Sequence, residues 1–487
     1  MSSNKIQKFL LFFFIILTLV LATFVVILYV NNSKVTDHGI VTNSGIIRIT
    51  TDPTNVSYNV YLDDKKQNLV DNRINDVTNG QYTIKVQAQN YTDWTKKVIV
   101  KNGIVTDLLV KLFPSKLSIT QVTQTNIGKA FVSIDGLYIY YVVKSSEFGS
   151  DTGIWRVATE QSTSFFTQID QNPLKLTDMT TQIQSVITGS DYTLTPNIDN
   201  TKLLIHDRKN NKFYVLNASD FNSTITDIGQ MVGFVPDNAS WMVDGSDLLV
   251  STQNILFDLN INSGTTNLIE YRPNYKIIYA NNETSVYVYE NSEKALYKYQ
   301  NQKLTKIDLK NIAITEDVTA ITVPGQNSNV LLLKTASGYY YLNLTRLYIK
   351  DILNGVKNPN LVTTSNDGTS SLFSTDSNLC YIFNAIDNIA SNSIETKETK
   401  IDEVDCSSAG YVAFAPQSTH LIYLYKIDSS IRSIEPDGSN KSILITDASL
   451  QPFANFNRQS DYLFVLMKDD STSTSKTNLY KVQLVNK

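Results

Sequence analysis

The feature of this sequence that most limits its fold is an internal repeat, which begins near residue 116 and continues to the C-terminus. Each unit contains an apolar strand, a polar tight turn, a second apolar strand, another turn, and a third strand with an aromatic side chain. The apolar residues alternate with a period of two, which predicts β-strands and excludes helical solenoids. The unit recurs about every 40–50 residues, a spacing typical of the four-stranded blades of a β-propeller.

The second strand of the unit can be traced eight times along the chain. It is predicted at Leu137–Val143, Lys202–His206, Asp247–Val250, Ser285–Tyr289, Val330–Leu333, Leu379–Phe383, Leu421–Tyr425 and Tyr462–Leu466. Residues 115–487 are therefore expected to form one propeller of seven or eight blades, with eight preferred. The first unit is longer, with an insertion around Ser162–Gln184. The strand around Lys116–Gln121 is expected to complete the last blade, because an open ring would leave an unpaired strand edge.

One repeat unit also carries a family resemblance. The segment Ala409–Thr446, and in particular its stretch PDGSNKSILIT, resembles a TolB-type, WD-like blade. The other units match that blade in pattern only, and the sequence has no Trp-Asp dipeptide and no Gly-Gly kelch pair, so the propeller subfamily stays open. The resemblance implies a propeller fold and favours a bacterial source.

A smaller β-rich segment precedes the repeats. Alternating apolar residues predict strands at Ile46–Thr50, Tyr58–Leu62, Tyr82–Ala88, Lys97–Val100 and Val105–Leu112. The runs GIIRITTDPTNVSYNVYLDDK, NGQYTIKVQAQNYTDWTKKVIVKNG and LLVKLFP resemble the PEGA domain over about residues 45–114. The resemblance implies a small extracytoplasmic β-sandwich without catalytic residues. Asp63-Asp64 is interpreted as a solvated hairpin turn, and Trp94 as a core aromatic residue.

Residues 9–30, from Phe9 to Val30, form an uncharged apolar run of about 22 residues, which as a helix is long enough to cross a bilayer. The run exceeds the apolar region of a signal peptide, and no small-residue cleavage site follows it. Lys5 and Lys8 precede the run and only Lys34 follows it closely, which predicts a cytoplasmic N-terminus. We therefore expect a cytoplasmic tail (1–8), a transmembrane helix (9–30), a linker (31–44) and an all-β ectodomain outside the cell membrane.

Charge and composition exclude several classes of function. The chain has 42 Lys and Arg residues against 46 Asp and Glu, a formal charge of −4, which argues against nucleic-acid binding. Its two cysteines and three histidines exclude a Cys-rich zinc module. If the propeller lies in an oxidising compartment, Cys380 and Cys406 could form a disulfide between neighbouring blades. The alternative, which the sequence favours, is two buried thiols that act as small apolar residues.

No group of residues in the sequence predicts catalysis, a cofactor or a metal ion. His38, His206 and His420 lie far apart, and no G-x-S-x-G nucleophile motif is present. Ser133-Ile134-Asp135-Gly136 is a fragment of the sialidase Asp-box and is interpreted as a plain hairpin turn. The chain is therefore expected not to be an enzyme.

Together these features predict a membrane-anchored, surface-facing scaffold that binds a protein or peptide on a loop face or at the central channel of the propeller. Loops on a rigid scaffold are where binding residues collect. The alternative is a protein that binds cell-envelope glycan, and a glycan-cleaving enzyme is the third hypothesis. A polar channel mouth with exposed Trp or Tyr would favour glycan, a broad apolar patch would favour protein, and two carboxylates in the channel would favour the enzyme.

Overall fold

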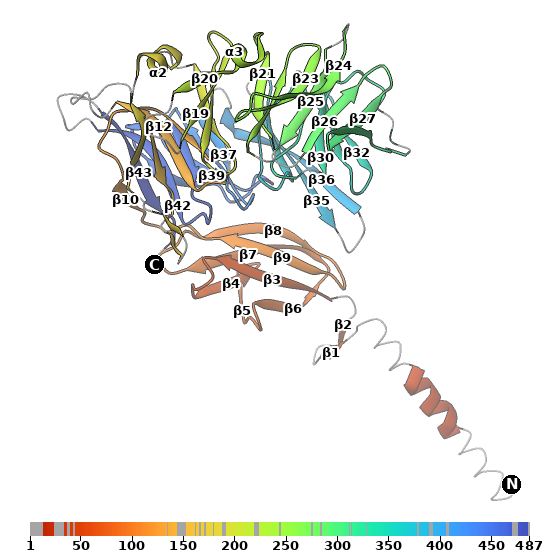
Figure 1. Cartoon of the computed structure of the whole chain (residues 1–487). Helices are drawn as coiled ribbons and strands as arrows, with labels where there is room; N and C mark the ends of the chain where they lie inside the picture. Colours follow the sequence, from red (N-terminus) through yellow and green to blue (C-terminus); the bar gives the residue numbers. More distant parts are fainter. Residues whose placement is uncertain are drawn as a thin grey trace, which may run out of the picture. The chain divides into compact units, whose positions relative to one another are not determined.

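The computed structural model describes residues 13–23, 34–36, 39–41, 44–133, 135–143, 152–160, 162–164, 167–169, 172–178, 180–187, 191–218, 224–242, 245–273, 276–282, 285–310, 312, 314–327, 329–376, 379–388, 393–405, 409–469 and 476–485. The chain divides into two compact units, Met1–Lys116 and Leu117–Lys487. Each unit is described here by itself (Figure 1).

Residues 13–23 are helical and lie inside the apolar run that predicts a transmembrane helix. Within the described part of the chain, no helix has the length and apolar character needed to cross a membrane. The predicted limits Phe9 and Val30 lie outside the described residues. The segment that was expected to be a linker contains a two-stranded hairpin of β1 (Lys34–Thr36) and β2 (Gly39–Val41).

The rest of the first unit is a sandwich of two sheets with the strand orders β6-β3-β9 and β5-β4-β7-β8. The strands are β3 (Ser44–Asp52), β4 (Tyr58–Leu62), β5 (Lys65–Gln67), β6 (Arg73–Thr78), β7 (Gly80–Ala88), β8 (Trp94–Val100) and β9 (Val105–Lys111). Burial alternates along β3, where Ile47 and Ile49 are fully buried, as its period-two pattern predicts. β3 pairs in parallel with β9, and the short strands β5 and β6 were not predicted.

Two sequence interpretations for this unit are confirmed. Asp63 and Asp64 both have positive φ angles, 46° and 63°, in the tight turn between β4 and β5, and Asp63 accepts a hydrogen bond from the Thr83 backbone N–H at 2.7 Å. The acidic pair is therefore a turn. Trp94 is 3% exposed and belongs to the core cluster of the sandwich.

The second unit contains eight four-stranded antiparallel sheets among the described residues, which follow one another along the chain as blades 1 to 8 (Figure 1). In blades 1 to 7 the strands lie in chain order, from an inner first strand to an outer fourth strand, whereas blade 8 takes its outer strand from the start of the unit. This arrangement is an eight-bladed propeller, the blade number that the sequence favoured.

The first four blades have these strands. Blade 1 has β11 (Ile127–Val132), β12 (Tyr138–Val143), β13 (Gly153–Ala158) and β16 (Leu174–Asp178), and blade 2 has β17 (Tyr192–Pro196), β18 (Lys202–Asp207), β19 (Lys212–Asn217) and β20 (Ile225–Asp227). Blade 3 has β21 (Asn238–Trp241), β22 (Asp247–Ser251), β23 (Ile255–Asn260) and β24 (Thr266–Tyr271), and blade 4 has β25 (Ile278–Asn282), β26 (Ser285–Glu290), β27 (Ala295–Gln300) and β28 (Lys303–Lys306).

The remaining four blades follow the same plan. Blade 5 has β29 (Ala320–Thr322), β30 (Val330–Lys334), β31 (Tyr339–Asn343) and β32 (Tyr348–Ile352), and blade 6 has β33 (Asn360–Thr364), β34 (Ser370–Ser374), β35 (Leu379–Asn388) and β36 (Ser393–Asp405). Blade 7 has β37 (Ala409–Phe414), β38 (Leu421–Tyr425), β39 (Ser430–Ile434) and β40 (Ser442–Thr446), and blade 8 has β41 (Leu450–Phe456), β42 (Tyr462–Asp469), β43 (Lys476–Gln483) and β10 (Ser118–Gln121).

The elements outside the blades are few. The predicted insertion in blade 1 contains the hairpin β14 (Ser162–Ser164) and β15 (Thr167–Ile169), and the short helix α2 (Thr181–Val186) follows the blade. A second short helix, α3 (Ile228–Val232), follows β20.

One predicted second strand is misassigned. Leu379–Phe383 belongs to β35, the third strand of blade 6, and the second strand of that blade is β34. The sequence of β34 is SSLFS, in which three serines interrupt the apolar run. Ser370 and Ser371 are nevertheless buried, because the second strand of a blade is covered by neighbours on both faces.

The core lies between the blades, where apolar side chains of each blade pack on the next. Shared buried clusters join blades 1 and 2, 2 and 3, 3 and 4, 4 and 5, 5 and 6, and 6 and 7. Tyr411 and Phe453 pack between blades 7 and 8 with ring centroids 6.0 Å apart. A final cluster contains Ile139 of blade 1 and Leu479 of blade 8. Every blade therefore has a packed neighbour on both sides, and the ring is closed.

The closing strand is the one that the sequence predicted. β10 pairs with β43 from Ser118↔Gln483 to Gln121↔Tyr480, so blade 8 combines three C-terminal strands with one strand from the start of the unit. This pairing removes the open edge that β43 would otherwise present.

Candidate functional site

A tight turn between the first and second strands recurs in six of the eight blades with the same hydrogen bond. The backbone N–H of the fourth turn residue donates to the carbonyl of the first, for example from Gly136 to Ser133 at 2.9 Å and from Ser460 to Asn457 at 3.0 Å. The fourth residue has a positive φ angle in every case, at Gly136, Asn200, Gly245, Gly368, Ser418 and Ser460. The predicted turn at Ser133–Gly136 is therefore one copy of this repeat.

These turns lie at the ends of the inner strands, on one face of the ring, which we call the turn face. A cavity of about 480 Å³ opens there at the central channel and is lined by residues of blades 1, 2, 5, 6, 7 and 8. We call this cavity the mouth. The second residue of the repeated turn lines it in four blades, as Ile198, Asn366, Pro416 and Arg458.

Two charged residues line the mouth, Asp135 and Arg458, and they differ in whether their side chains are hydrogen-bonded. Asp135 accepts hydrogen bonds from the Ser133 hydroxyl at 2.6 Å and the Leu137 N–H at 3.0 Å, and its second oxygen accepts from Asn200 Nδ2 at 2.9 Å. The guanidinium of Arg458 is exposed and makes no hydrogen bond or ion pair with any described residue. The mouth is therefore lined by one acid whose oxygens already accept hydrogen bonds and by one cation whose N–H groups are not engaged by any described residue.

Two further polar side chains, those of Asn455 and Tyr411, line the mouth together with Arg458. Asn455 on β41 is 9% exposed, and its amide makes no side-chain hydrogen bond within the described part of the chain. Burial raises the pKa of Tyr411 on β37 to about 12, so its hydroxyl keeps its proton at neutral pH. The mouth thus combines neutral hydrogen-bonding groups, the unengaged guanidinium of Arg458 and the hydrogen-bonded carboxylate of Asp135.

The channel wall on the opposite face carries mainly hydroxyl, amide and apolar groups, with Asp237 and Lys276 as its charged lining residues. A cavity of about 420 Å³ runs along the inner strands β25 and β29, from Ile278 to Asn281 and from Ala320 to Thr322. Several of its hydroxyl and amide groups bind one another: Asn238 donates to the Tyr279 hydroxyl at 2.9 Å, and the hydroxyls of Ser251 and Tyr279 are hydrogen-bonded at 2.8 Å.

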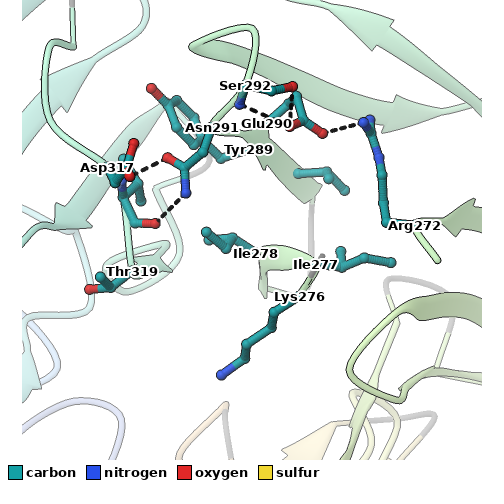
Figure 2. A pocket seen from close by; sticks show the side chains of 12 residues that line it. Arg272, Lys276, Ile277, Ile278, Tyr289, Glu290, Asn291, Ser292, Asp317 and Thr319 are labelled. Atoms are coloured by element: carbon teal, nitrogen blue, oxygen red, sulfur yellow. Dashed lines mark hydrogen bonds and ion pairs between the residues drawn. The ribbon is translucent and has the colours of Figure 1, made fainter. Parts of the chain in front are cut away.

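A cavity of about 650 Å³ adjoins the channel on that opposite face, between blades 4 and 5 (Figure 2). Its polar side chains are committed to the fold. Glu290 forms an ion pair with Arg272 and accepts from the Ser292 hydroxyl at 2.7 Å, and the Asn291 amide binds both backbone groups of Val318. Figure 2 shows Lys276 pointing away from these partners. Because Glu290, Asn291 and Ser292 already have partners, this cavity is a weaker candidate than the mouth despite its size.

The structure does not bring the predicted histidines together. His206 on β18 stacks on Phe213 at 4.2 Å between ring centroids, and His420 is 2% exposed in the core of blade 7 with Glu435 4.0 Å away. His38 lies outside the described residues. No cluster of metal-ligating side chains occurs among the residues that are described.

Cys380 is completely buried in β35 and is disulfide-bonded, which differs from the favoured interpretation of a buried free thiol. Cys406 lies outside the described residues, so the pairing of these two cysteines stays a prediction.

Blade 6 carries a second feature of the turn face. β34 pairs with β35 only as far as Ser370↔Asn384, but β35 and β36 continue to pair to Asn388↔Ser393. The extension starts beside the repeated turn, where the Ala385 N–H donates to the Thr369 carbonyl at 2.8 Å. The β35–β36 hairpin therefore projects beyond the turn face (Figure 1).

The base of this hairpin is held by both neighbouring blades. Glu398 of β36 accepts from the Leu353 N–H of blade 5 at 3.1 Å, and Lys397 donates to the Asp437 carbonyl of blade 7 at 3.4 Å. On the exposed part, Ile386 is 57% exposed.

Comparison with known families identifies the first unit. Residues 44–116 match the PEGA domain family and are a PEGA domain, as the sequence predicted. No curated protein matches the chain.

Solved structures similar to the chain are propellers of low identity. The β-propeller domain of Cps50 (Swd1) from Myceliophteria thermophila is 12% identical, with a TM-score of 0.35, over 60% of this chain and 96% of that chain. The WD40 domain of SCAP from fission yeast is 11% identical, with a TM-score of 0.42, over 76% and 98%. An oligogalacturonate lyase from Vibrio parahaemolyticus is 10% identical, with a TM-score of 0.38, over 76% and 99%.

Proposed function

We propose that this chain is a membrane-anchored, non-enzymatic scaffold that binds a protein partner through the turn face of its propeller. The single observation that carries the proposal is the β35–β36 hairpin, which rises beside the mouth on that face. A projecting strand pair adds contact area on both of its sides, whereas a small ligand would need only the mouth. Standard protein interfaces bury about 800 Å² on each partner, so the contact surface has to extend beyond a single cavity.

The hydrogen bonds that fix the base of the hairpin to the neighbouring blades support the same function. Because Glu398 and Lys397 bind to blades 5 and 7, the extended strands start from a fixed position. A rigid element loses less conformational entropy on binding than a mobile loop does. The exposed Ile386 provides an apolar anchor on the extended part of the hairpin.

A second function, the binding of an envelope glycan, is favoured by a different observation. The channel wall on the opposite face is rich in hydroxyl and amide groups, with Tyr279 among them, and it also carries Asp237 and Lys276. Such a wall suits a neutral polar ligand. Glycan cleavage is less well supported, because hydrolysis requires two carboxylates about 5–10 Å apart. Among the described lining residues of the mouth the carboxylate is that of Asp135, and its oxygens are occupied by the turn.

The membrane anchor and the extracytoplasmic location remain part of the proposal. They are supported by the uncharged run of residues 9–30 and by its helical section, residues 13–23. Protease added to intact cells should digest the propeller if it lies outside. Protection of the whole chain in intact cells whose outer surface is accessible would contradict this location.

Crosslinking on intact cells through a C-terminal tag, followed by mass spectrometry, tests the scaffold function. The Ile386→Ser variant should reduce recovery of the main partner by about fivefold or more, as expected for a contact worth at least 1 kcal/mol. The matched control is Ile427→Ser, because Ile427 is 72% exposed in the turn between the second and third strands, on the opposite face. Equal recovery with both variants would contradict the use of the hairpin. Recovery of glycan without protein would favour the second function.

A further inference from the structure

The second residue of the repeated turn lines the mouth in blades 2, 6, 7 and 8, and only one of these four residues is charged. The residues are Ile198, Asn366, Pro416 and Arg458. Because the four turns share one backbone conformation, the difference lies in the side chain and not in the fold. A single cation therefore stands at a position where the other described blades present neutral groups.

The surroundings of Arg458 leave its charge available to a ligand. The oxygens of the other charged lining residue, Asp135, accept two hydrogen bonds within the turn of blade 1 and one from Asn200 in the turn of blade 2. The neighbouring acid Glu160 accepts from the Asn457 amide at 3.1 Å and the Gln459 backbone N–H at 3.2 Å, so it binds the residues on either side of Arg458. These contacts fix the Arg458 backbone while the guanidinium makes no bond with any described residue.

The position of the Arg458 backbone is constrained from a second side. A Cβ built on Gly136 would lie 3.8 Å from the Arg458 Cα, so the turns of blades 1 and 8 are in close approach. A cation on a fixed backbone loses less freedom on binding than one on a mobile loop.

Further hydrogen-bond donors line the same cavity. The Asn455 amide is nine-tenths buried and lacks a side-chain partner among the described residues, although buried amides normally have one. Tyr411 contributes a hydroxyl that remains protonated. A planar guanidinium with neutral donors beside it matches a carboxylate, which accepts two parallel N–H bonds from arginine.

We propose that the mouth is a recognition site for a carboxylate of an acidic peptide segment, with Arg458 as its cation and Asn455 and Tyr411 as additional donors. This inference rests on the proposed function and names the chemistry of its partner at the mouth. A peptide is favoured over a carboxylated sugar because the β35–β36 hairpin stands on the same face and extends the surface beyond the cavity.

The test uses the full chain in nonionic detergent and saturation-transfer NMR titration with two capped peptides, Gly-Ser-Glu-Glu-Ser-Gly and its Gln-Gln counterpart. The Glu peptide should bind at least about tenfold more tightly, because one charge-assisted pair contributes about 1.4 kcal/mol. Arg458→Gln should abolish this preference. Arg458→Lys should restore part of it, because lysine keeps the charge without the planar fork.

The matched control is Arg208→Gln. Arg208 is also exposed and makes no side-chain bond with a described residue, but it follows β18 in the turn between second and third strands, on the opposite face. It should leave the preference unchanged. Equal binding of the two peptides to the native chain, or an equal effect of both arginine substitutions, would overturn the proposal.

An oligouronide serves as a third probe. If it binds in an Arg458-dependent way and the Glu peptide does not, the proposal is wrong and the site takes a carboxylated sugar. The Ile386→Ser variant should bind the Glu peptide normally. Recovery of the cellular partner in Ile386→Ser tests the hairpin, whereas binding of the Glu peptide tests the mouth. Because the two measurements depend on different residues, the two proposals can fail independently.

Discussion

Ile119 of β10 pairs with Val482 of β43, which joins the start of the propeller to its end in one antiparallel ladder. The ladder closes blade 8, while the packing of blade 8 on blade 1 is made by the buried cluster that contains Ile139 and Leu479. Closure therefore has a backbone component at the outer edge and an apolar component between the blades.

Substitutions in these two components are expected to lower the free energy of unfolding by different amounts. Leu479 is fully buried, so Leu479→Ala should lower the free energy of unfolding by about 3 kcal/mol through lost burial and a cavity. Ile119 is 44% exposed, and Ile119→Ala should cost less than about 1 kcal/mol. Urea unfolding followed by tryptophan fluorescence measures both. A loss for Ile119→Ala as large as that for Leu479→Ala would mean that the outer strand dominates closure.

Gly325, at the junction of blades 5 and 6, is a second position where a small substitution should strongly destabilise the propeller. Its φ angle is +55°, and a Cβ built there would lie 2.2 Å from the Ser365 carbonyl oxygen. Gly325→Ala should therefore lower the free energy of unfolding by about 3 kcal/mol or more, since it adds a backbone clash to left-handed strain.

Gly264→Ala is the control for this prediction. Gly264 has a φ angle of +71° but nothing within 4 Å of the added Cβ, so it carries the strain without the clash. Gly264→Ala should lower the free energy of unfolding by about 1–2 kcal/mol. Urea midpoints that are equal for the two variants would show that the blades separate to accept the methyl group.

The propeller could be predicted because its physical cause is visible in the sequence. A second strand such as LIYLY (Leu421–Tyr425) is buried on both faces, which requires a continuous apolar run bounded by turn residues. The misassigned strand in blade 6 shows the limit of this signal. In β34 the buried serines take the place of apolar residues, and burial of a small hydroxyl depends on neighbouring blades that local sequence does not specify.

The mouth could not be predicted, because its lining comes from six blades that are distant in sequence. Arg458 lies in the stretch NRQSD, which looks like any polar turn. A signal was present, however. Aligning this turn with SNDGT (Ser365–Thr369) places Arg458 at the position of Asn366 and shows that Arg458 is the charged residue at the second turn position. This alignment requires that the inner strands of the two blades are first placed in register.

In the PEGA domain, the ion pair between Lys111 and Asp52 predicts an asymmetric response. Lys111 Nζ lies 2.6 Å from Asp52 Oδ2, and the exposed fractions of the two side chains are 4% and 25%. Asp52→Asn leaves a buried ammonium without its carboxylate and should lower the free energy of unfolding by about 3 kcal/mol. Lys111→Met leaves a carboxylate that water can reach and should cost clearly less. Thermal unfolding of the full chain, followed in the PEGA domain by hydrogen exchange of β3 and β9, measures the difference. Equal losses would show that the charge of Lys111 is solvated.

The hydroxyl of Tyr289 predicts how stability depends on pH. Tyr289 is 3% exposed, and its hydroxyl has no hydrogen-bond partner among the described residues. Burial, and secondarily the negative charge of Asp317, raises the pKa of Tyr289 to about 12. In the unfolded chain a tyrosine has a pKa of about 10. Between these values the unfolded state loses its proton first, so the stability associated with Tyr289 is complete below about pH 10 and is lost as the pH rises towards 12.

Tyr289→Phe should therefore leave the free energy of unfolding at pH 7 unchanged or raise it by up to about 1 kcal/mol, because it removes an unpaired buried polar atom. Between pH 7 and pH 11 the variant should lose about 1.4 kcal/mol less than the native chain, which corresponds to one pH unit above the unfolded pKa. Urea unfolding at the two pH values measures this difference. Tyr271→Phe is the control, since Tyr271 is 52% exposed and should lose as much stability as the native chain. An identical loss in Tyr289→Phe and the native chain would mean that the Tyr289 hydroxyl is hydrated in the folded protein, and water in that position would have to enter between blades 4 and 5.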